Sequence, residues 1–285
     1  MSACNPWLLL VIAGCGSSMA CAQLQLLPDR ESQCVFAGDA RKITVTWHNA
    51  GDKSAGADVR TQLYQTSSAT AVPLSEKPWK QIEILPGQTV LESAAMDFPE
   101  VKAETQFLIQ WLEGTNHVVG KTEVLVYPTN LLAEIKMLMG ENVFGVLDPN
   151  NELKPRLKQN GVEFFDLGET SLDDFQGKLA VIGPFQSKAQ MREGLAPTIQ
   201  KIARKGAAVI WIQPPRAPRD KIKPSFYLAP EGKGAVVVVQ SDLVANLAEN
   251  PRSQLNLIYF SKLALNPELF LLPDLNTQPR NQNTP

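Results

Sequence analysis

The spacing of apolar residues changes at Pro128, and this change limits the folds open to the chain. Before it, apolar and polar residues alternate, as in Ile43-Thr-Val-Thr-Trp47, where an extended strand would have one apolar and one polar face. After it, uninterrupted apolar runs such as Ala235-Val-Val-Val-Val239 alternate with helical patterns. The sequence therefore predicts two domains of different construction.

The first domain is predicted over residues 23–128. Alternating runs recur near residues 59–63, 82–84, 107–111 and 124–126, and turn sequences such as Pro86-Gly87 separate them. Roughly seven short strands without a helical stretch predict an all-β immunoglobulin-like sandwich. The stretches ITVTWHNAGD (43–52) and LPGQTV (85–90) resemble the immunoglobulin-like accessory domains of secreted bacterial proteins. Trp47 and Trp111 are in phase with aliphatic neighbours and are expected in the core, with Trp79 nearer the surface.

The second domain is predicted over residues 129–265. Five apolar strands alternate with helical segments, and the longest segment, residues 187–205, carries an apolar stripe at Met191, Leu195, Ile199 and Ile202. This alternation predicts an α/β flavodoxin-like fold with a parallel sheet covered on both faces. Residues 266–285 end in a stretch rich in Asn, Gln and Pro, and we expect a largely disordered tail there.

Three stretches of the second domain carry a family resemblance. They are VLDPNNELKPRLKQNGVEFFDL (146–167), LAVIGP (179–184) and KGAAVIWIQ (205–213). Together they resemble the class I glutamine-amidotransferase-like domains that follow an immunoglobulin-like domain in some secreted bacterial family-two glycoside hydrolases. The resemblance implies a role in polysaccharide metabolism outside the cytoplasm.

Active members of that superfamily use a Cys–His–acid triad, and this chain lacks the residues for one. Its two histidines, His48 and His117, both precede Pro128, and no His or Cys occurs after it. No nucleophile elbow follows the predicted strands. Neither a dinucleotide-binding glycine motif nor a Walker A sequence is present, and the histidines lack metal-ligand spacing, so no cofactor, metal or catalytic residue is predicted.

Ligands of open parallel sheets bind beyond the carboxyl ends of the strands. A basic, proline-rich loop also follows the fourth strand, and its Arg side chains suit carboxylate or sulfate, although a stiff solvated loop is the alternative. The candidate ligand-binding residues are Asp148, Asp166, Gln186, Gln213, Arg216, Arg219, Lys221, Lys223 and Gln240.

The N-terminus predicts export by one of two routes. An apolar core over residues 7–13 is followed by Ala20-Cys21-Ala22, which predicts a signal peptide over residues 1–22 with cleavage before Gln23. The segment Ile12-Ala13-Gly14-Cys15 resembles a lipobox, which implies a lipoprotein signal over 1–14 and a lipid on Cys15. The mature protein is expected to be periplasmic or extracellular, with membrane contact only through that lipid.

We therefore predict an exported, non-catalytic accessory protein that binds a polysaccharide, an oligosaccharide or an exported glycan-processing enzyme. An envelope scaffold without a sugar ligand is the first alternative. A hydrolase that uses carboxylates such as Asp166 and Asp173 is the second. The net charge of −2 argues against nucleic acid as a partner.

Overall fold

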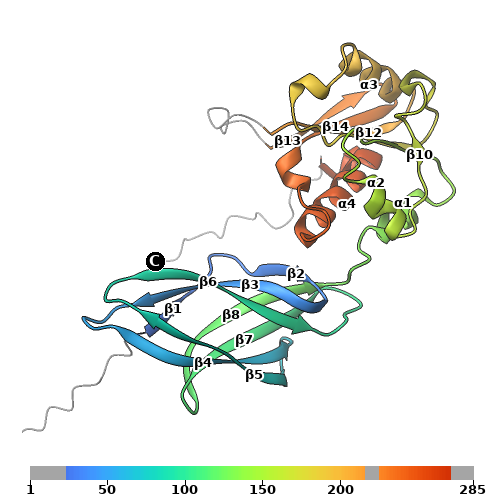
Figure 1. Ribbon diagram of the computed structural model, residues 1–285. Helices are drawn as coiled ribbons and strands as arrows, with labels where there is room; N and C mark the ends of the chain where they lie inside the picture. Colours follow the sequence, from blue (N-terminus) through green and yellow to red (C-terminus); the bar gives the residue numbers. More distant parts are fainter. Residues whose placement is uncertain (1–23, 216–224, 271–285) are drawn as a thin grey trace, which may run out of the picture.

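The computed structural model describes residues 24–215 and 225–270, which form two lobes (Figure 1). The predicted export segment, with Cys15, Ala22 and Gln23, lies outside the described residues, as do residues 271–285 of the predicted tail. The regular elements of the first lobe are all strands: β1 (Leu24–Leu27), β2 (Gln33–Phe36), β3 (Gly38–Asn49), β4 (Ala55–Thr66), β5 (Ala71–Ile84), β6 (Thr89–Phe98), β7 (Thr105–Glu113) and β8 (His117–Tyr127).

The second lobe combines strands, α-helices and short 3-10 helices. In chain order these are α1 (Ala133–Met139), β9 (Phe144–Leu147), α2 (Lys154–Gln159), β10 (Phe165–Asp166), η1 (Leu172–Asp174), β11 (Leu179–Ile182), η2 (Lys188–Gln190), α3 (Leu195–Arg204), β12 (Ala208–Gln213), β13 (Phe226–Glu231), β14 (Gly234–Gln240), η4 (Ser241–Val244), α4 (Pro251–Leu265) and η5 (Pro267–Phe270). No described helix combines the length and the apolar composition needed to cross a bilayer.

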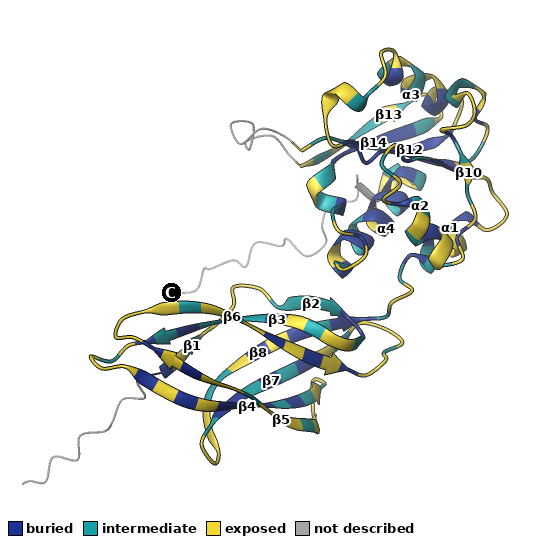
Figure 2. Ribbon diagram, in the orientation of Figure 1, coloured by how far each residue is buried: buried dark blue, intermediate teal, exposed yellow. Residues whose placement is uncertain are grey.

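Two sheets enclose one core in the first lobe. The strand orders are β1-β3-β6 and β2-β8-β7-β4-β5. Buried and exposed residues alternate along the strands, as the alternating colours of Figure 2 show. Ile43, Val45 and Trp47 of β3 are buried against Phe107 and Trp111 of β7, so the period-two pattern places one face of each strand in the core.

Three tryptophans form the centre of this core. Trp47 and Trp111 are fully buried, and Trp79 of β5 is half-buried. The Trp79 ring lies 6.1 Å from the Trp47 centroid and 5.0 Å from the Trp111 centroid, and the Trp47 and Trp111 centroids are 5.9 Å apart. The Trp111 indole Nε1 donates to the Thr122 hydroxyl at 3.0 Å, so its polar group is satisfied inside the core.

The two edges of the sandwich are closed by side chains. On one side, the amide of Gln33 in β2 donates to the Thr44 carbonyl at 2.5 Å and accepts from the Thr44 N–H at 3.0 Å, as a neighbouring strand would. On the other side, β5 and β6 end their sheets without a ladder between them. Ion pairs Lys77–Asp97 and Lys80–Glu92, each 2.6 Å long, join these two strands.

The second-lobe sheet has the strand order β10-β9-β11-β12-β14-β13. Strands β10, β9, β11, β12 and β14 are mutually parallel, and β13 is antiparallel to β14. Apolar residues of α1, α2 and α4 cover one face of the sheet, and those of α3 cover the other. The central strands are therefore buried on both faces, which explains their unbroken apolar sequences.

The fold class predicted from the sequence, an immunoglobulin-like sandwich followed by an α/β flavodoxin-like parallel sheet, is wrong. Strands make up 44% of the described residues and form three sheets, and helices are few. The second-lobe sheet is mixed, because β13 runs antiparallel along its edge. Only the 3-10 turn η1 lies between β10 and β11, where the predicted class needs a covering helix.

Local signals explain these differences. Strand β13 contains Pro230 and follows a proline-rich segment, so its sequence reads as a loop, although an edge strand tolerates proline. The predicted helix over 187–205 is shorter, because Gly194 adopts a left-handed φ of 82° immediately before Leu195. The first lobe has eight strands of up to 14 residues instead of roughly seven short ones, and β2 pairs with β8 in parallel.

One arginine joins the lobes at the start of α4. The Arg252 guanidinium donates to the Glu31 carboxylate at 2.6 Å, to the Ser32 carbonyl at 2.8 Å and to the Cys34 sulfur at 3.1 Å. The Asn250 side chain accepts from the Arg252 N–H at 3.0 Å and caps the helix. The segment between β1 and β2 is thereby held against the first turn of α4.

Candidate functional site

The carboxyl ends of the parallel strands carry a network of the chain's own side chains. Asp148 follows β9 and is 5% exposed. Its Oδ2 accepts from the N–H groups of Leu153 and Lys154 at 2.8 and 2.9 Å, so this carboxylate holds the start of α2. Asp148 Oδ1 is buried and has no hydrogen-bond partner among the described residues.

Asp166, at the end of β10, is linked to Asp148 through one lysine. Lys154 donates its ammonium to Asp166 Oδ2 at 2.6 Å, and the Gly168 N–H donates to Oδ1 at 2.8 Å. The hydrogen bond from Lys154 holds the pKa of Asp166 below its ordinary value of 3.8. The structure therefore brings these two predicted site residues together. Asp148 binds backbone N–H groups, and Asp166 binds the Lys154 ammonium and one backbone N–H.

Because the pKa of Asp166 is lower in the folded chain than in the unfolded chain, the ion pair stabilises the fold above the ordinary carboxyl pKa. That stability is lost as the pH falls below about 4 and Asp166 gains a proton. We expect Asp166→Asn to be less stable than wild type at pH 7, and the difference to shrink as the pH falls below about 4. Urea midpoints measured between pH 2 and 7 test this.

Asp174→Asn removes a different, exposed carboxylate and is the matched control. Its urea midpoint should stay close to that of wild type at every pH. If the urea midpoints of Asp166→Asn and wild type change in parallel with pH, the pair between Lys154 and Asp166 does not stabilise the fold.

Amide side chains fill the space beyond β9 and β11. Asn150 donates to the Pro184 carbonyl at 2.9 Å, and Gln190 donates to Asn150 Oδ1 at 2.8 Å. Gln186 donates its N–H to Gln190 Oε1 at 2.7 Å and its side-chain amide to Glu152 at 2.9 Å. In the described structure these groups satisfy one another across the strand ends.

The remaining predicted site residues are separated from this network. Gln213 and Gln240 are Cα partners at the ends of β12 and β14, and the buried Gln240 Oε1 has no partner among the described residues. The four basic residues, Arg216, Arg219, Lys221 and Lys223, lie outside the described residues. His48 contacts Thr89 and His117 contacts Glu113, both on the exposed surface of the first lobe. No group of His, Cys, Asp or Glu side chains in the described part of the chain has the geometry to hold a metal ion.

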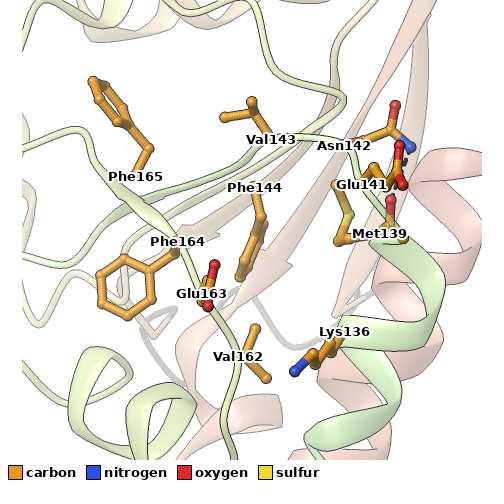
Figure 3. A pocket seen from close by; sticks show the side chains of 11 residues that line it. Lys136, Met139, Glu141, Asn142, Val143, Phe144, Val162, Glu163, Phe164 and Phe165 are labelled. Carbon is orange, nitrogen blue, oxygen red and sulfur yellow. Dashed lines mark hydrogen bonds between the residues drawn. The ribbon is translucent and has the colours of Figure 1, made fainter.

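A cavity of about 430 Å³ opens at the opposite, amino end of the sheet (Figure 3). We call it the amino-end cavity. Its apolar wall is Met139, Phe144, Val162 and Phe164. Lys136 and Met139 come from α1 on one side, the segment 162–165 forms the other side, and Phe144 lies between them. Val143 and Phe165 lie at the rim and are 53% and 48% exposed.

Polar side chains surround this apolar wall. Lys136, Glu141, Asn142 and Glu163 line the cavity and are exposed. Asn142 donates its amide to the Met139 carbonyl at 2.8 Å, which fixes the turn after α1 and leaves its amide oxygen available. Within residues 24–215 and 225–270, Lys136, Glu141 and Glu163 form no ion pair. The cavity thus combines aromatic surface with uncommitted donors and acceptors.

Sequence reasoning missed this cavity, because it considered only the carboxyl ends of the strands. Two signals in the chain point to it. Gly140-Glu141-Asn142 places polar residues immediately before a buried strand, and Phe164-Phe165 puts two aromatic rings on opposite faces of a strand start. One of two such rings must face away from the covering helix.

No family model matches the chain, and no curated protein matches it. A mutant β-glucosidase from Listeria innocua in complex with laminaribiose is 14% identical with a TM-score of 0.28, over 37% of this chain and 16% of that one. The alkylpurine DNA glycosylase AlkC from Pseudomonas fluorescens, bound to DNA with an abasic-site analog, is 10% identical with a TM-score of 0.29, over 38% and 31%. Spo0M, a sporulation control protein from Bacillus subtilis, is 13% identical with a TM-score of 0.28, over 43% and 59%.

The chain spans less than two thirds of the length of each of these proteins. Likenesses at these TM-scores carry no argument about fold or function.

Proposed function

We propose that the chain is an exported, non-catalytic accessory protein that binds a glycan in the amino-end cavity. The observation that carries the proposal is the composition of that cavity, in which aromatic surface lies beside uncommitted carboxylate, amide and ammonium groups. A volume of about 430 Å³ is within the range of small-ligand sites.

Sugars present two kinds of surface, and the cavity has a counterpart for each. The C–H face of a pyranose packs on an aromatic ring, whose face is electron-rich. Phe164 is half-buried and lines the cavity. The hydroxyl groups of a sugar both donate and accept hydrogen bonds, which suits Glu163 and Asn142 as acceptors and Lys136 as a donor.

A binding role without catalysis agrees with the residue content of the chain. No His or Cys follows Pro128, so the second lobe has neither a triad base nor a thiol nucleophile. The carboxylates Asp148 and Asp166, at the other end of the sheet, are engaged by backbone N–H groups and Lys154. Export remains part of the proposal on the evidence of residues 1–22 of the sequence.

The test is a thermal-shift titration of the full chain with neutral, uronic and sulfated oligosaccharides. A ligand that binds the folded state stabilises it by about 2.7 kcal/mol at 100 times its Kd, so we expect a midpoint that rises with sugar concentration. Lys136→Ala/Glu163→Ala removes two exposed cavity groups, each worth about 1 kcal/mol as a hydrogen bond, and should weaken binding roughly tenfold or more. No reducing sugar should be released.

Lys188→Ala/Glu193→Ala is the matched control, because both side chains are exposed and neither lines the cavity. It should bind as wild type does. The proposal fails if no sugar shifts the midpoint, or if both double variants bind as wild type does.

A further inference from the structure

A second cavity, of about 530 Å³, lies on the other side of the loop that precedes β9. We call it the lysine cavity. It shares residues 141–143 with the amino-end cavity. Its other walls are the turn before β11, with Gln176 and Lys178, and the end of α3 with the following turn, which includes Lys205.

The two cavities open on opposite faces of the sheet. Phe144 and Val162, which line the amino-end cavity, belong to the core that α1, α2 and α4 cover. Phe175 and Ile202, which line the lysine cavity, belong to the core that α3 covers. Val143 lines both cavities and is 53% exposed, so it forms an apolar ridge between them at the amino end of the sheet.

The cavities differ in charge. The lysine cavity is lined by two exposed ammonium groups, Lys178 and Lys205, and by one carboxylate, Glu141. Lys205 donates to the Asp173 carbonyl oxygen at 3.0 Å, which is uncharged, so its positive charge is not neutralised. Neither lysine forms an ion pair within the described residues. The amino-end cavity has the opposite charge balance, with one ammonium group, Lys136, and two carboxylates, Glu141 and Glu163.

We propose that the two cavities are consecutive parts of one site for an acidic oligosaccharide, a chain that carries uronate carboxylates. The proposal rests on the function proposed above and specifies its ligand. One sugar occupies the amino-end cavity, the chain crosses the Val143 ridge, and a carboxylate of the next sugars lies between Lys178 and Lys205. Ammonium groups bind such carboxylates as point charges.

The experiment compares neutral oligoglucosides of two to four residues with the same oligomers carrying one terminal glucuronate, titrated calorimetrically into the full chain. Exposed ion pairs are each worth about 0.2–1 kcal/mol, so two lysines together should favour the uronate about two- to thirtyfold. This preference should shrink as salt is raised. Affinity should rise with length, because only the longer chains reach both cavities.

Lys178→Met/Lys205→Met should abolish the preference for the uronate. Lys53→Met/Lys188→Met removes two exposed lysines elsewhere and should keep the preference. Equal binding of the two sugar classes, or a preference that survives in Lys178→Met/Lys205→Met, would overturn this inference alone. If no sugar of either class binds, the proposed function itself is wrong.

Discussion

Replacing Trp111 with alanine should destabilise the first lobe by about 3–5 kcal/mol, the range for large aromatic truncations in a core. The Trp111 side chain is fully buried and contacts the rings of both Trp47 and Trp79. The substitution also leaves the buried hydroxyl of Thr122 without the indole N–H that it accepts. Such a loss is a large fraction of the stability of an ordinary domain.

Urea unfolding followed by far-UV circular dichroism measures this change, with the slope expected to stay constant and the midpoint to fall. Thr122→Val is the matched variant, because it keeps the three rings and removes only the hydrogen bond. We expect it to cost about 1–3 kcal/mol. If Trp111→Ala unfolds at the wild-type midpoint, the three-tryptophan cluster does not hold this core together.

Gly234→Ala should have the second large effect, in the other lobe. A Cβ at this position would lie 2.2 Å from the Ala207 carbonyl oxygen and 2.5 Å from that of Ala203. Both are backbone atoms, at the turn between α3 and β12 and at the end of α3, so neither can rotate away. Relief requires β14 to move from its place beside β12, and we expect a cost on the order of 3 kcal/mol.

Gly56→Ala is the control, because a Cβ there would meet only the Ile82 carbonyl oxygen, at an ordinary distance of 3.7 Å. Its stability should stay within about 1 kcal/mol of wild type. Differential scanning calorimetry suits this comparison, because the two lobes can unfold in separate transitions. A Gly234→Ala protein with unchanged transitions would show that the close approach of β14 to α3 is not as described.

The alternation of apolar residues was enough to predict which faces of the first-lobe strands are buried. Ile43, Trp47, Phe107 and Trp111 all lie inside, as their period of two indicates. The pattern carried less information where long-range pairing decides the structure. Nothing local to Gln33 shows that its amide will pair with Thr44, eleven residues away, in the central strand of the other sheet.

The second lobe shows the same limit. The run Ala235-Val-Val-Val-Val239 predicts a buried strand, and β14 is one. The sequence of β13 does not show that it will turn back along β14, because that depends on an open sheet edge built by distant residues. Asp148 lies at a strand end, as predicted. Its role in holding the start of α2 depends on where the N–H groups of Leu153 and Lys154 lie, and the sequence does not show this.

The candidate site was the least predictable part. The amino-end cavity exists because α1, the residues before β9 and the segment 162–165 approach one another without filling the space between them. Hydrophobic patterning reports which side chains are buried, and it contains no measure of the space left between them. Lys136 and Glu163 read as ordinary surface charges in the sequence.

The ion pairs between β5 and β6 affect how readily two molecules of this chain associate. Exposed pairs such as Lys77–Asp97 contribute little to folding, because solvent screens their charges. Their position matters more, because they connect the last strands of two sheets, whose unpaired backbone groups could otherwise template another chain. A strand from a second molecule must first displace Lys77 and Lys80 from their carboxylates. Salt that screens these exposed pairs therefore lowers a barrier to edge-to-edge association while the sandwich stays folded.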